Sequence, residues 1–370
     1  MLDELLGSPD LWETLAGDAR AVVLYGMGNG AEKILRVCEA RGIAVRDVFA
    51  SDDFVRGQEF RGFRVCRWDD IKTRYGVENT VVLVAFGTAR PDVLDRVRAI
   101  AAETALFVPD LPPFGDGLFD RAFALAHRDD LLTARGLLFD DASRRIFDLV
   151  LRARLTGDLN ALLEAVSTPE ENSALPRPGT FRAAADLGAY TGDTVRALGD
   201  RAPGLETVYA MEPDPRNFRK LAAYAAQETR FRVVPVAAAA WNTETDLVFE
   251  ESGNRNASAA VNRSAALGGR PARTRTVPAL PLDRVVGSAP LDYIKYDVEG
   301  SEREALLGSR EVIRRCVPTL RVAAYHRAED LFALPLFLRE RFPVYRRFYL
   351  RRTAGIPAWD LDLWAVADGA

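Results

Sequence analysis

Cysteine and histidine are scarce in this sequence of 370 residues. The three cysteines, Cys38, Cys66 and Cys316, lie far apart and form no CxxC pair, which excludes a disulfide framework or a thiolate zinc site within one region. The two histidines, His127 and His326, are too few for a multi-histidine metal site. Any catalytic imidazole must therefore belong to one of these two residues, and we predict no bound metal.

The sequence also lacks an excess of charge of one sign and long apolar runs. It has 49 Lys and Arg against 53 Asp and Glu, and the net charge of −4 gives no general field for attracting nucleic acid or an anionic membrane. No apolar run approaches the ~20 residues that span a bilayer, and the N-terminus has no charged-then-apolar leader. We expect a cytoplasmic protein without nucleic-acid or membrane partners, and a homo-oligomer is compatible with the sequence.

The order of apolar and helical segments predicts two α/β units. At ~150 residues per domain, the length corresponds to two or three domains. Apolar runs at 21–25, 45–50 and 81–86 alternate with helical patterns, which indicates a doubly wound, Rossmann-like parallel sheet in residues 1–110. Residues 111–178 have helical spacing and end in several prolines, as expected for a helical connector.

Seven further candidate strands follow in residues 179–370, near 181–187, 208–211, 231–236, 293–298, 320–325, 344–350 and 360–366. Their alternation with helices predicts a second doubly wound sheet. The stretch 252–273 is small, polar and too long for an ordinary connection, so we expect either a disordered insertion or a mobile lid there.

A glycine loop with the sequence GMGNGA occupies residues 26–31, between an expected strand and an expected helix. Its GxGxxA spacing allows backbone amides and the helix dipole to receive a phosphate, and an acid at the end of the next strand could accept ribose hydroxyls. A tight turn in a scaffold that binds nothing explains the same glycines. The candidate nucleotide-binding residues are Gly26, Gly28, Gly30 and Asp52, with Asp53 as the alternative acid.

A second glycine loop, DLGAYTGD at 186–193, has Tyr190 where a dinucleotide site needs its second glycine, which favours a ligand without a pyrophosphate. The order of Asp186, Gly188 and Glu212 suits S-adenosylmethionine, with Glu212 chelating the ribose hydroxyls. Helix capping and solvation are the alternative explanation for Asp186 and Glu212. The candidate cofactor-binding residues are Asp186, Gly188, Ala189, Tyr190, Gly192, Asp193, Thr194, Glu212, Pro213, Val236 and Ala237.

An acidic cluster follows the strand expected near 293–298. Lys295 and Asp297 alternate onto one face of this strand, ~7 Å apart. If the strand before His326 is its neighbour, His326 could reach Asp297 or Glu299 and act as a general base toward a hydroxyl. A solvent-facing His326 and a buried Lys295–Asp297 ion pair are the structural alternatives. The candidate catalytic residues are His326, Asp297, Glu299 and Lys295.

Two charged features allow further interpretations. The carboxylates of this cluster could hold Mg²⁺, although nothing in their spacing requires a metal. The arginine-rich segment 339–352 fits a solvated strand face, and its functional interpretation is a clamp for an anionic acceptor.

Four segments follow one another within residues 180–350: DLGAYTGDT, YAMEPDPRNFRKL, IKYDVEGSEREALLGS and AAYHRAEDL. They resemble the FkbM family of S-adenosylmethionine-dependent methyltransferases, and the IKxDxEGxE element is the most specific part of the resemblance. The resemblance implies a seven-stranded class I methyltransferase fold and O-methylation of sugars or natural products. The preceding residues also look like those of longer bacterial members, which carry an N-terminal Rossmann-like domain similar to nucleotide-sugar-binding domains.

The sequence thus favours a methyltransferase that uses S-adenosylmethionine and acts on a hydroxyl of a small-molecule acceptor that is sugar-like or nucleotide-linked. One alternative is a sensor or scaffold that binds nucleotides or cofactor without turnover. Another is an NAD-dependent oxidoreductase that uses the 26–31 loop, although no hydride-transfer constellation follows that loop.

Overall fold

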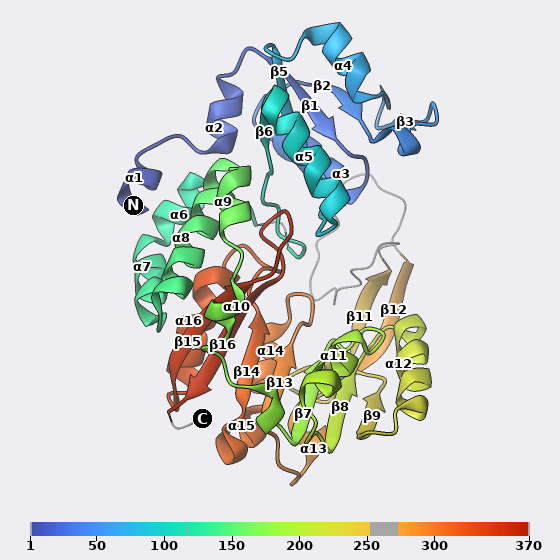
Figure 1. Cartoon of the computed structure of the whole chain (residues 1–370), viewed down its shortest axis with the longest axis vertical. Coiled ribbons are helices and arrows are strands. Elements are labelled where there is room, and N and C mark those ends of the chain that lie inside the picture. Colours follow the sequence, from blue (N-terminus) through green and yellow to red (C-terminus); the bar gives the residue numbers. More distant parts are fainter. Residues whose placement is uncertain (1, 116, 252–272, 369–370) are drawn as a thin grey trace.

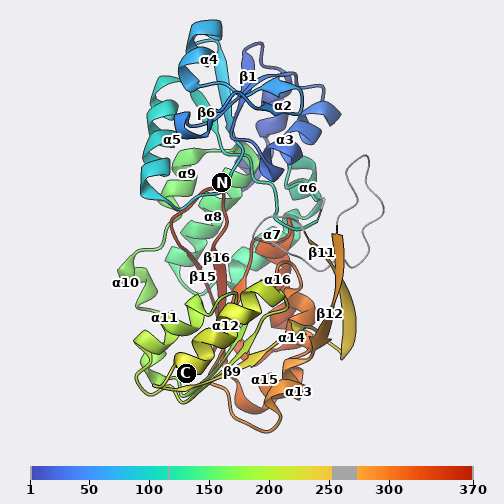
Figure 2. The same ribbon diagram turned by 90° about the vertical axis from the view of Figure 1, so that its right-hand side faces the viewer.

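A computed structural model describes residues 2–115, 117–251, 273–368 of the chain. Two parallel-stranded sheets lie at opposite ends of an elongated molecule, as both Figure 1 and Figure 2 show. The predicted α/β class is confirmed. The main hydrophobic core runs through the whole length and includes Val23, Phe147 and Ile294. Because this core is shared, the domain limits at 110 and 178 stay predictions.

The N-terminal sheet has four parallel strands in the order β2-β1-β5-β6. Its central strands are continuous apolar runs because helices cover both faces. Its strands and the short hairpin beside it are β1 (Ala21–Tyr25), β2 (Val45–Phe49), β3 (Glu59–Phe60), β4 (Phe63–Arg64), β5 (Thr80–Val84) and β6 (Ala105–Phe107). Its helices are α1 (Leu2–Leu6), α2 (Leu11–Ala16), α3 (Asn29–Ala40), α4 (Trp68–Tyr75) and α5 (Pro91–Glu103), with the 3₁₀ turn η1 (Asp52–Phe54).

Short helices fill the stretch between the two sheets. In this middle part, α7 packs against α16 and α8 packs against β15, so the connector is attached to the C-terminal sheet. No helix among the described residues is both long and apolar enough to cross a bilayer. The helices are α6 (Arg121–Ala126), α7 (Arg128–Leu137), α8 (Asp141–Thr156), α9 (Leu159–Glu164) and α10 (Pro169–Asn172), followed by the 3₁₀ turn η2 (Pro178–Thr180).

The C-terminal sheet has seven strands in the order β15-β16-β14-β13-β7-β8-β9, of which β16 pairs antiparallel with both β14 and β15. The central position of β13 brings its carboxyl end between those of β14 and β7. The strands are β7 (Ala183–Leu187), β8 (Thr207–Met211), β9 (Arg232–Val236), β13 (Tyr293–Tyr296), β14 (Thr319–Ala323), β15 (Tyr345–Arg352) and β16 (Leu361–Ala367). The helices are α11 (Asp193–Arg201), α12 (Pro215–Gln227), α13 (Leu282–Val286), α14 (Glu302–Leu307), α15 (Arg310–Cys316) and α16 (Asp330–Arg341).

A separate three-stranded sheet was not expected from the sequence. It consists of β10 (Ala239–Ala240), β11 (Thr245–Glu251) and β12 (Arg273–Leu280), in the order β10-β12-β11. Figure 2 shows β11 and β12 along one side of the molecule. The insertion or lid predicted for 252–273 falls on residues 252–272, which lie outside the described residues, and Arg273 begins β12.

Candidate active site

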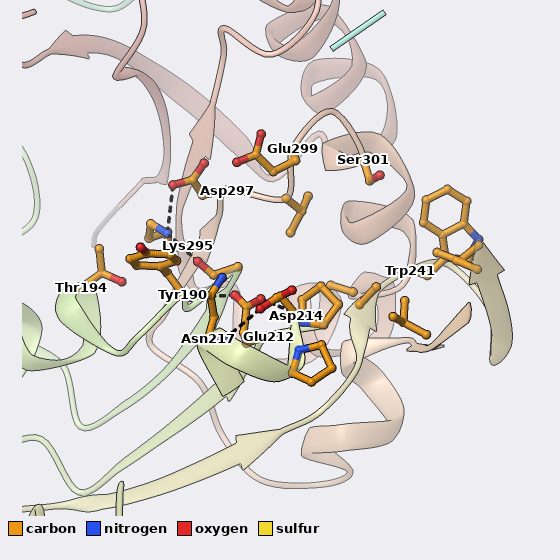
Figure 3. A pocket seen from close by; sticks show the side chains of 18 of the residues that line it. Tyr190, Thr194, Glu212, Asp214, Asn217, Trp241, Lys295, Asp297, Glu299 and Ser301 are labelled. Atoms are coloured by element: carbon orange, nitrogen blue, oxygen red, sulfur yellow. Dashed lines mark hydrogen bonds and ion pairs between the residues drawn. The ribbon is translucent and has the colours of Figure 1, made fainter. Parts of the chain in front are cut away.

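A cavity of about 380 Å³ lies at the carboxyl ends of β7, β8 and β13. This is the edge at which open α/β sheets bind ligands. Figure 3 shows Asp297 and Glu299 across the cavity from Glu212, with Trp241 to one side. The lining residues are Gly188, Tyr190, Asp193, Thr194, Glu212, Pro213, Asp214, Pro215, Asn217, Ala239, Ala240, Trp241, Leu247, Arg275, Val277, Lys295, Asp297, Val298, Glu299, Ser301, Tyr325 and Asp360.

Glu212 is fixed by the backbone immediately after β8. One carboxylate oxygen accepts the Tyr190 N–H at 2.8 Å, and the other accepts the Asp214 N–H at 2.8 Å. Each oxygen therefore keeps acceptor capacity for a ligand in the cavity. Burial raises the pKa of Glu212 to about 7, because desolvation of the carboxylate outweighs the two backbone hydrogen bonds.

Asp186 and Lys295 form a buried charged layer under the cavity. The Lys295 ammonium lies 3.2 Å from Asp186 Oδ1 and 3.2 Å from Asp297 Oδ2. Asp186 also accepts a short hydrogen bond from the Thr194 hydroxyl. Burial lowers the pKa of Lys295, but the two carboxylates outweigh burial and raise it, so the lysine stays charged. The predicted pairing of Lys295 with Asp297 is present, and Asp186 is its second partner.

The predicted cofactor-binding residues divide into two groups. Those that line the cavity are Gly188, Tyr190, Asp193, Thr194, Glu212 and Pro213. Those that do not are Asp186, Ala189, Gly192, Val236 and Ala237; of these, Asp186 acts beneath the cavity and Ala189 is completely buried.

Gly188 is required by the neighbouring strand. Its φ of +83° lies in the left-handed region, and a Cβ built there would stand 1.9 Å from the carbonyl oxygen of Asp297. We therefore expect Gly188→Ala to lower the free energy of unfolding by at least about 2 kcal/mol, measured by urea denaturation. Gly136→Ala is the control, because a Cβ there meets no described atom within 4 Å; equal stability of the two variants would contradict the expectation.

Asp297 and Glu299 follow β13, and both line the cavity. Glu299 has a φ of +54°, which is an uncommon conformation for a non-glycine residue. Burial raises the pKa of Glu299, with the charge of Asp297 acting in the same direction and that of His326 opposing. Burial also raises the pKa of Asp297, but Lys295 and His326 outweigh burial and lower it.

His326 lies behind these carboxylates. Strands β13 and β14 are neighbours, which meets the condition set in the sequence analysis, and His326 Nε2 lies 3.5 Å from Asp297 and 3.6 Å from Glu299. Its Nδ1 lies 2.8 Å from Glu302 Oε1, a partner that sequence inspection missed. His326 is 1% exposed and does not line the cavity. The solvent-facing alternative is therefore wrong.

The protonation of His326 differs from that of a general base. Burial lowers its pKa, but Glu302, Glu299 and Asp297 outweigh burial and raise the pKa to about 10. At neutral pH the ring is an imidazolium, which has no lone pair for a substrate proton. The expectation that His326 itself abstracts the proton is thus not supported by its charge state.

Several lining residues were missed in the sequence. Trp241, Leu247 and Val277 come from the unexpected β10-β12-β11 sheet and form an apolar wall. Asp360 ends a loop whose Ile356 exchanges two backbone hydrogen bonds with Thr88 of the N-terminal part. The isolated Trp241 was the one available signal, since a lone aromatic after a small-residue run suggests a binding surface.

The N-terminal glycine loop follows β1 as predicted, and its residues 29–31 already form the first turn of α3. A Cβ at Gly26 would stand 2.6 Å from the Phe86 ring, and one at Gly30 would stand 2.2 Å from the carbonyl oxygen of Ala85, so packing explains both glycines. A Cβ at Gly28 would meet no described atom within 4 Å. Asp52 begins η1 and is exposed at the end of β2.

The arginine-rich segment does not form a clamp at the cavity. Arg351 and Arg352 are 3% and 1% exposed, so the solvated-face alternative is wrong for both. Arg351 pairs with Asp140 at 2.6 Å, and Arg352 donates to the carbonyl oxygen of Leu162, which attaches β15 to the connector helices. Neither residue lines the cavity.

The lining of the cavity is acidic. Among the lining residues, six carboxylates face two cationic side chains, which favours a cationic or neutral ligand over an anion. Within the described part of the chain, no group of three or more His, Cys, Asp or Glu side chains is arranged to hold a metal ion. The carboxylates are Asp193, Glu212, Asp214, Asp297, Glu299 and Asp360, and the cations are Arg275 and Lys295.

Comparisons with known proteins bear on the fold and on the activity. Residues 186–346 match the model of the methyltransferase FkbM domain, so a methyltransferase function is supported for this part of the chain. The crystal structure of a methyltransferase FkbM from Methylobacillus flagellatus KT aligns with a TM-score of 0.69 and 21% identity, covering 98% of this chain and 95% of that chain. This likeness shows a shared fold over nearly the whole chain.

Other solved structures match less closely. An rRNA methylase from Streptococcus thermophilus has a TM-score of 0.33 and 12% identity, covering 50% of this chain and 86% of that chain. Fibrillarin from Aeropyrum pernix, in complex with natively bound S-adenosyl-L-methionine, has a TM-score of 0.32 and 12% identity, covering 53% of this chain and 70% of that chain. No curated protein matches the chain.

Proposed function

We propose that this protein is an S-adenosylmethionine-dependent O-methyltransferase that acts on a hydroxyl of a sugar-like or nucleotide-linked acceptor. One observation carries the proposal. A single cavity has the buried Glu212 carboxylate and the Gly188 turn on one side, and the Asp297 and Glu299 carboxylates on the other. The first pair suits a nucleoside with a ribose, and the second pair suits removal of a proton from an acceptor.

The residues present fit this cofactor. Both Glu212 oxygens already accept one backbone N–H each, which orients their remaining lone pairs for two ribose hydroxyls. The acidic lining suits a ligand that carries positive charge. When bound, S-adenosylmethionine supplies a methyl group attached to a positively charged sulfur.

Glu299 is the general base in this proposal. It lines the cavity, its side chain is 32% exposed, and its raised pKa makes it a better proton acceptor than an ordinary glutamate. Asp297 is less suitable because Lys295 pairs with it and lowers its pKa. As the acceptor oxygen becomes the nucleophile, Glu299 takes its proton. Before this transfer, the His326 imidazolium stabilises the ionised forms of Asp297 and Glu299.

The N-terminal glycine loop is the proposed site for the nucleotide part of a linked acceptor. The open space at Gly28 and the exposed Asp52 support this assignment, whereas the packing of Gly26 and Gly30 fits a scaffold equally well. Because the loop at 353–360 is paired with Thr88, the N-terminal part also contributes to the wall that carries Asp360.

A methyl-transfer screen tests the proposed function. Full-length protein is incubated with methyl-labelled S-adenosylmethionine and a panel of nucleotide sugars and sugar-containing metabolites. The expected result is transfer of label to a hydroxyl of at least one acceptor, lost in Glu299→Gln. Cofactor binding without transfer to any member of a broad panel would favour the sensor or scaffold alternative.

Replacement of Glu212 should weaken cofactor binding. Glu212→Gln loses charge-assisted hydrogen bonds, and we expect the Kd for S-adenosylmethionine, measured by titration calorimetry, to rise by about 10- to 100-fold. Glu206→Gln is the matched control, because Glu206 lies just before β8, at its other end, and is exposed. An unchanged Kd in Glu212→Gln would remove the ribose assignment.

The same residue predicts a pH dependence of binding. Ribose hydroxyls donate to the ionised carboxylate, so a proton bound to Glu212 must leave before the ligand can bind. Because the pKa of Glu212 is about 7, the Kd should rise by roughly tenfold between pH 8 and pH 6. In Glu212→Gln this pH dependence should disappear, and a Kd that is flat across this range in the wild type would contradict the role.

A further inference from the structure

The aromatic side chain of Phe114, from outside the C-terminal sheet, touches the turns that follow β13 and β14 at the site. After β6 the chain enters the space between the two sheets, as the teal segment of Figure 1 shows, and residues 110–115 lie there. The Phe114 N–H donates to the carbonyl oxygen of His326 at 2.9 Å. The Arg327 guanidinium lies over the Phe114 ring, 4.4 Å from its centre, and donates to the Gly300 carbonyl oxygen at 2.7 Å. The ring therefore bridges the turns after β13 and β14.

The turn after β13 is shaped around this ring. Glu299 and Gly300 have φ values of +54° and +92°, so two successive residues adopt the left-handed region. A Cβ at Gly300 would stand 2.7 Å from the Phe114 ring, so the ring rests directly on the Gly300 backbone. Glu302 also holds this turn, because it accepts the N–H groups of Val298 and Gly300 at 3.1 and 3.4 Å. Glu299 thus belongs to a turn that both Phe114 and Glu302 contact.

The segment that carries Phe114 is itself anchored at two points. From α3, the Lys33 ammonium donates to the carbonyl oxygens of Pro112 and Pro113 at 2.7 and 3.1 Å. From α8, the buried Arg154 pairs with Asp110 at 3.1 Å. Lys33 lies in α3, the helix that begins within the 26–31 loop, so the N-terminal unit reaches the turn after β13 through a short series of contacts: Lys33 with Pro112 and Pro113, and Phe114 with Gly300.

We propose that Phe114 is a positioning residue for methyl transfer: held by Lys33 of the N-terminal unit, it fixes the turn 297–301 so that Glu299 faces the cavity. This inference rests on the proposed function and adds a role for the N-terminal unit that does not need a nucleotide. A base must stay within hydrogen-bond reach of the proton it removes, and a displacement of ~1 Å can cost about 10²-fold in rate. Loss of the ring leaves space beside Gly300 into which the turn can relax.

The activity test uses the full chain and variants on both sides of the contact. We expect Phe114→Ala to lower kcat by about 10- to 100-fold with the Kd for S-adenosylmethionine within about twofold of the wild type. Phe114→Leu, which refills part of the space, should recover part of kcat. Lys33→Met, outside the cavity, should lower kcat by about 3- to 10-fold. Phe139→Ala is the matched control, because Phe139 is 54% exposed and lies on the connector.

A second readout needs no turnover. The chain has only two imidazoles, so NMR can follow the titration of His326 in the protein without ligands, with the His127 signals as an internal reference. If Phe114→Ala lets Glu299 move away from its 3.6 Å distance to His326, the pKa of His326 should fall by about 0.5 to 1. The carboxylates that face this imidazole are Asp297, Glu299, Glu302 and Asp330.

The outcomes separate this inference from the proposed function. A lower kcat with unchanged cofactor affinity and a lower pKa of His326 would support positioning. A wild-type kcat and an unchanged His326 titration in Phe114→Ala would overturn it. It would also be overturned if Phe114→Ala and Phe139→Ala both lost kcat in proportion to their loss of Tm, because the effect would then reflect stability. If the wild type transfers no methyl group, the proposed function fails and the titration alone decides. If Phe114→Ala does not fold, Lys33→Met and Phe114→Leu decide by the same measurements.

Discussion

Glu299→Gln should lower kcat for methyl transfer by about 10²- to 10⁴-fold, the range expected when a general base is lost. The amide has nearly the shape of the carboxylate but cannot take the proton of the acceptor hydroxyl. Because Glu212 and the Gly188 turn stay intact, the Kd for S-adenosylmethionine should change by less than about threefold. Single-turnover kinetics with labelled cofactor, together with calorimetry, measure the two quantities separately.

The pH profile gives an independent check on Glu299. Its ionised form is active, and its pKa is raised above the usual 4.5, so kcat should increase with pH along a limb that lies above this value. Glu304→Gln is the control, since this nearby glutamate in α14 does not line the cavity. Full turnover in Glu299→Gln together with an inactive Asp297→Asn would transfer the base role to Asp297.

The sheet edge that carries the site could be predicted from the sequence because its signals are local. Small or apolar runs that end in acids mark the carboxyl ends of β7, β8 and β13. Alternation along a strand was sufficient to pair Lys295 with Asp297. The sequence left the adjacency of β13 and β14 open, and given that adjacency, strand spacing accounts for His326 lying within 4 Å of both acids. These inferences need only strand geometry.

The charge of His326 could not be predicted in this way. Its imidazolium state depends on carboxylates that outweigh the effect of burial, above all on Glu302, which lies at the start of α14 with Oε1 2.8 Å from His326 Nδ1. A histidine at a strand end with two nearby acids suggests a base, whereas one enclosed by three acids is a cation. The difference lies in packing that a linear sequence does not reveal.

Contacts between distant segments explain why the remaining site residues could not be predicted from the sequence. The wall at Trp241 requires β11 and β12 to pair across a stretch of chain with no local pattern. Asp360 reaches the cavity because Ile356 pairs with Thr88, and Phe114 reaches Gly300 from the segment that leaves the first sheet. A sequence interpreted one element at a time treats such segments as linkers.

Lys295→Met should lower the free energy of unfolding by about 3 to 5 kcal/mol at pH 7, the cost of leaving the buried Asp186 carboxylate without its cation. The Lys295 side chain is 6% exposed and lies 3.2 Å from both Asp186 and Asp297. Methionine fills nearly the same volume, so the loss reflects charge and not a cavity. Urea denaturation followed by circular dichroism measures the change.

The dependence of this loss on pH distinguishes charge from packing. In the wild type the pKa of Asp297 is lowered, so its ionised form stabilises the folded protein. This stabilisation is fully present above the ordinary pKa of 3.8 and is lost as the pH falls through the lowered value. In Lys295→Met, Asp297 loses the cation that contributes most to lowering its pKa, so its pKa rises and less of this stabilisation remains at pH 7. The difference between the two proteins should therefore be largest near pH 7 and smaller at pH 5. Lys72→Met, which breaks exposed pairs with Asp69 and Glu103, should leave the stability nearly unchanged at either pH. An equal effect of the two variants would show that the buried layer is not held by charge.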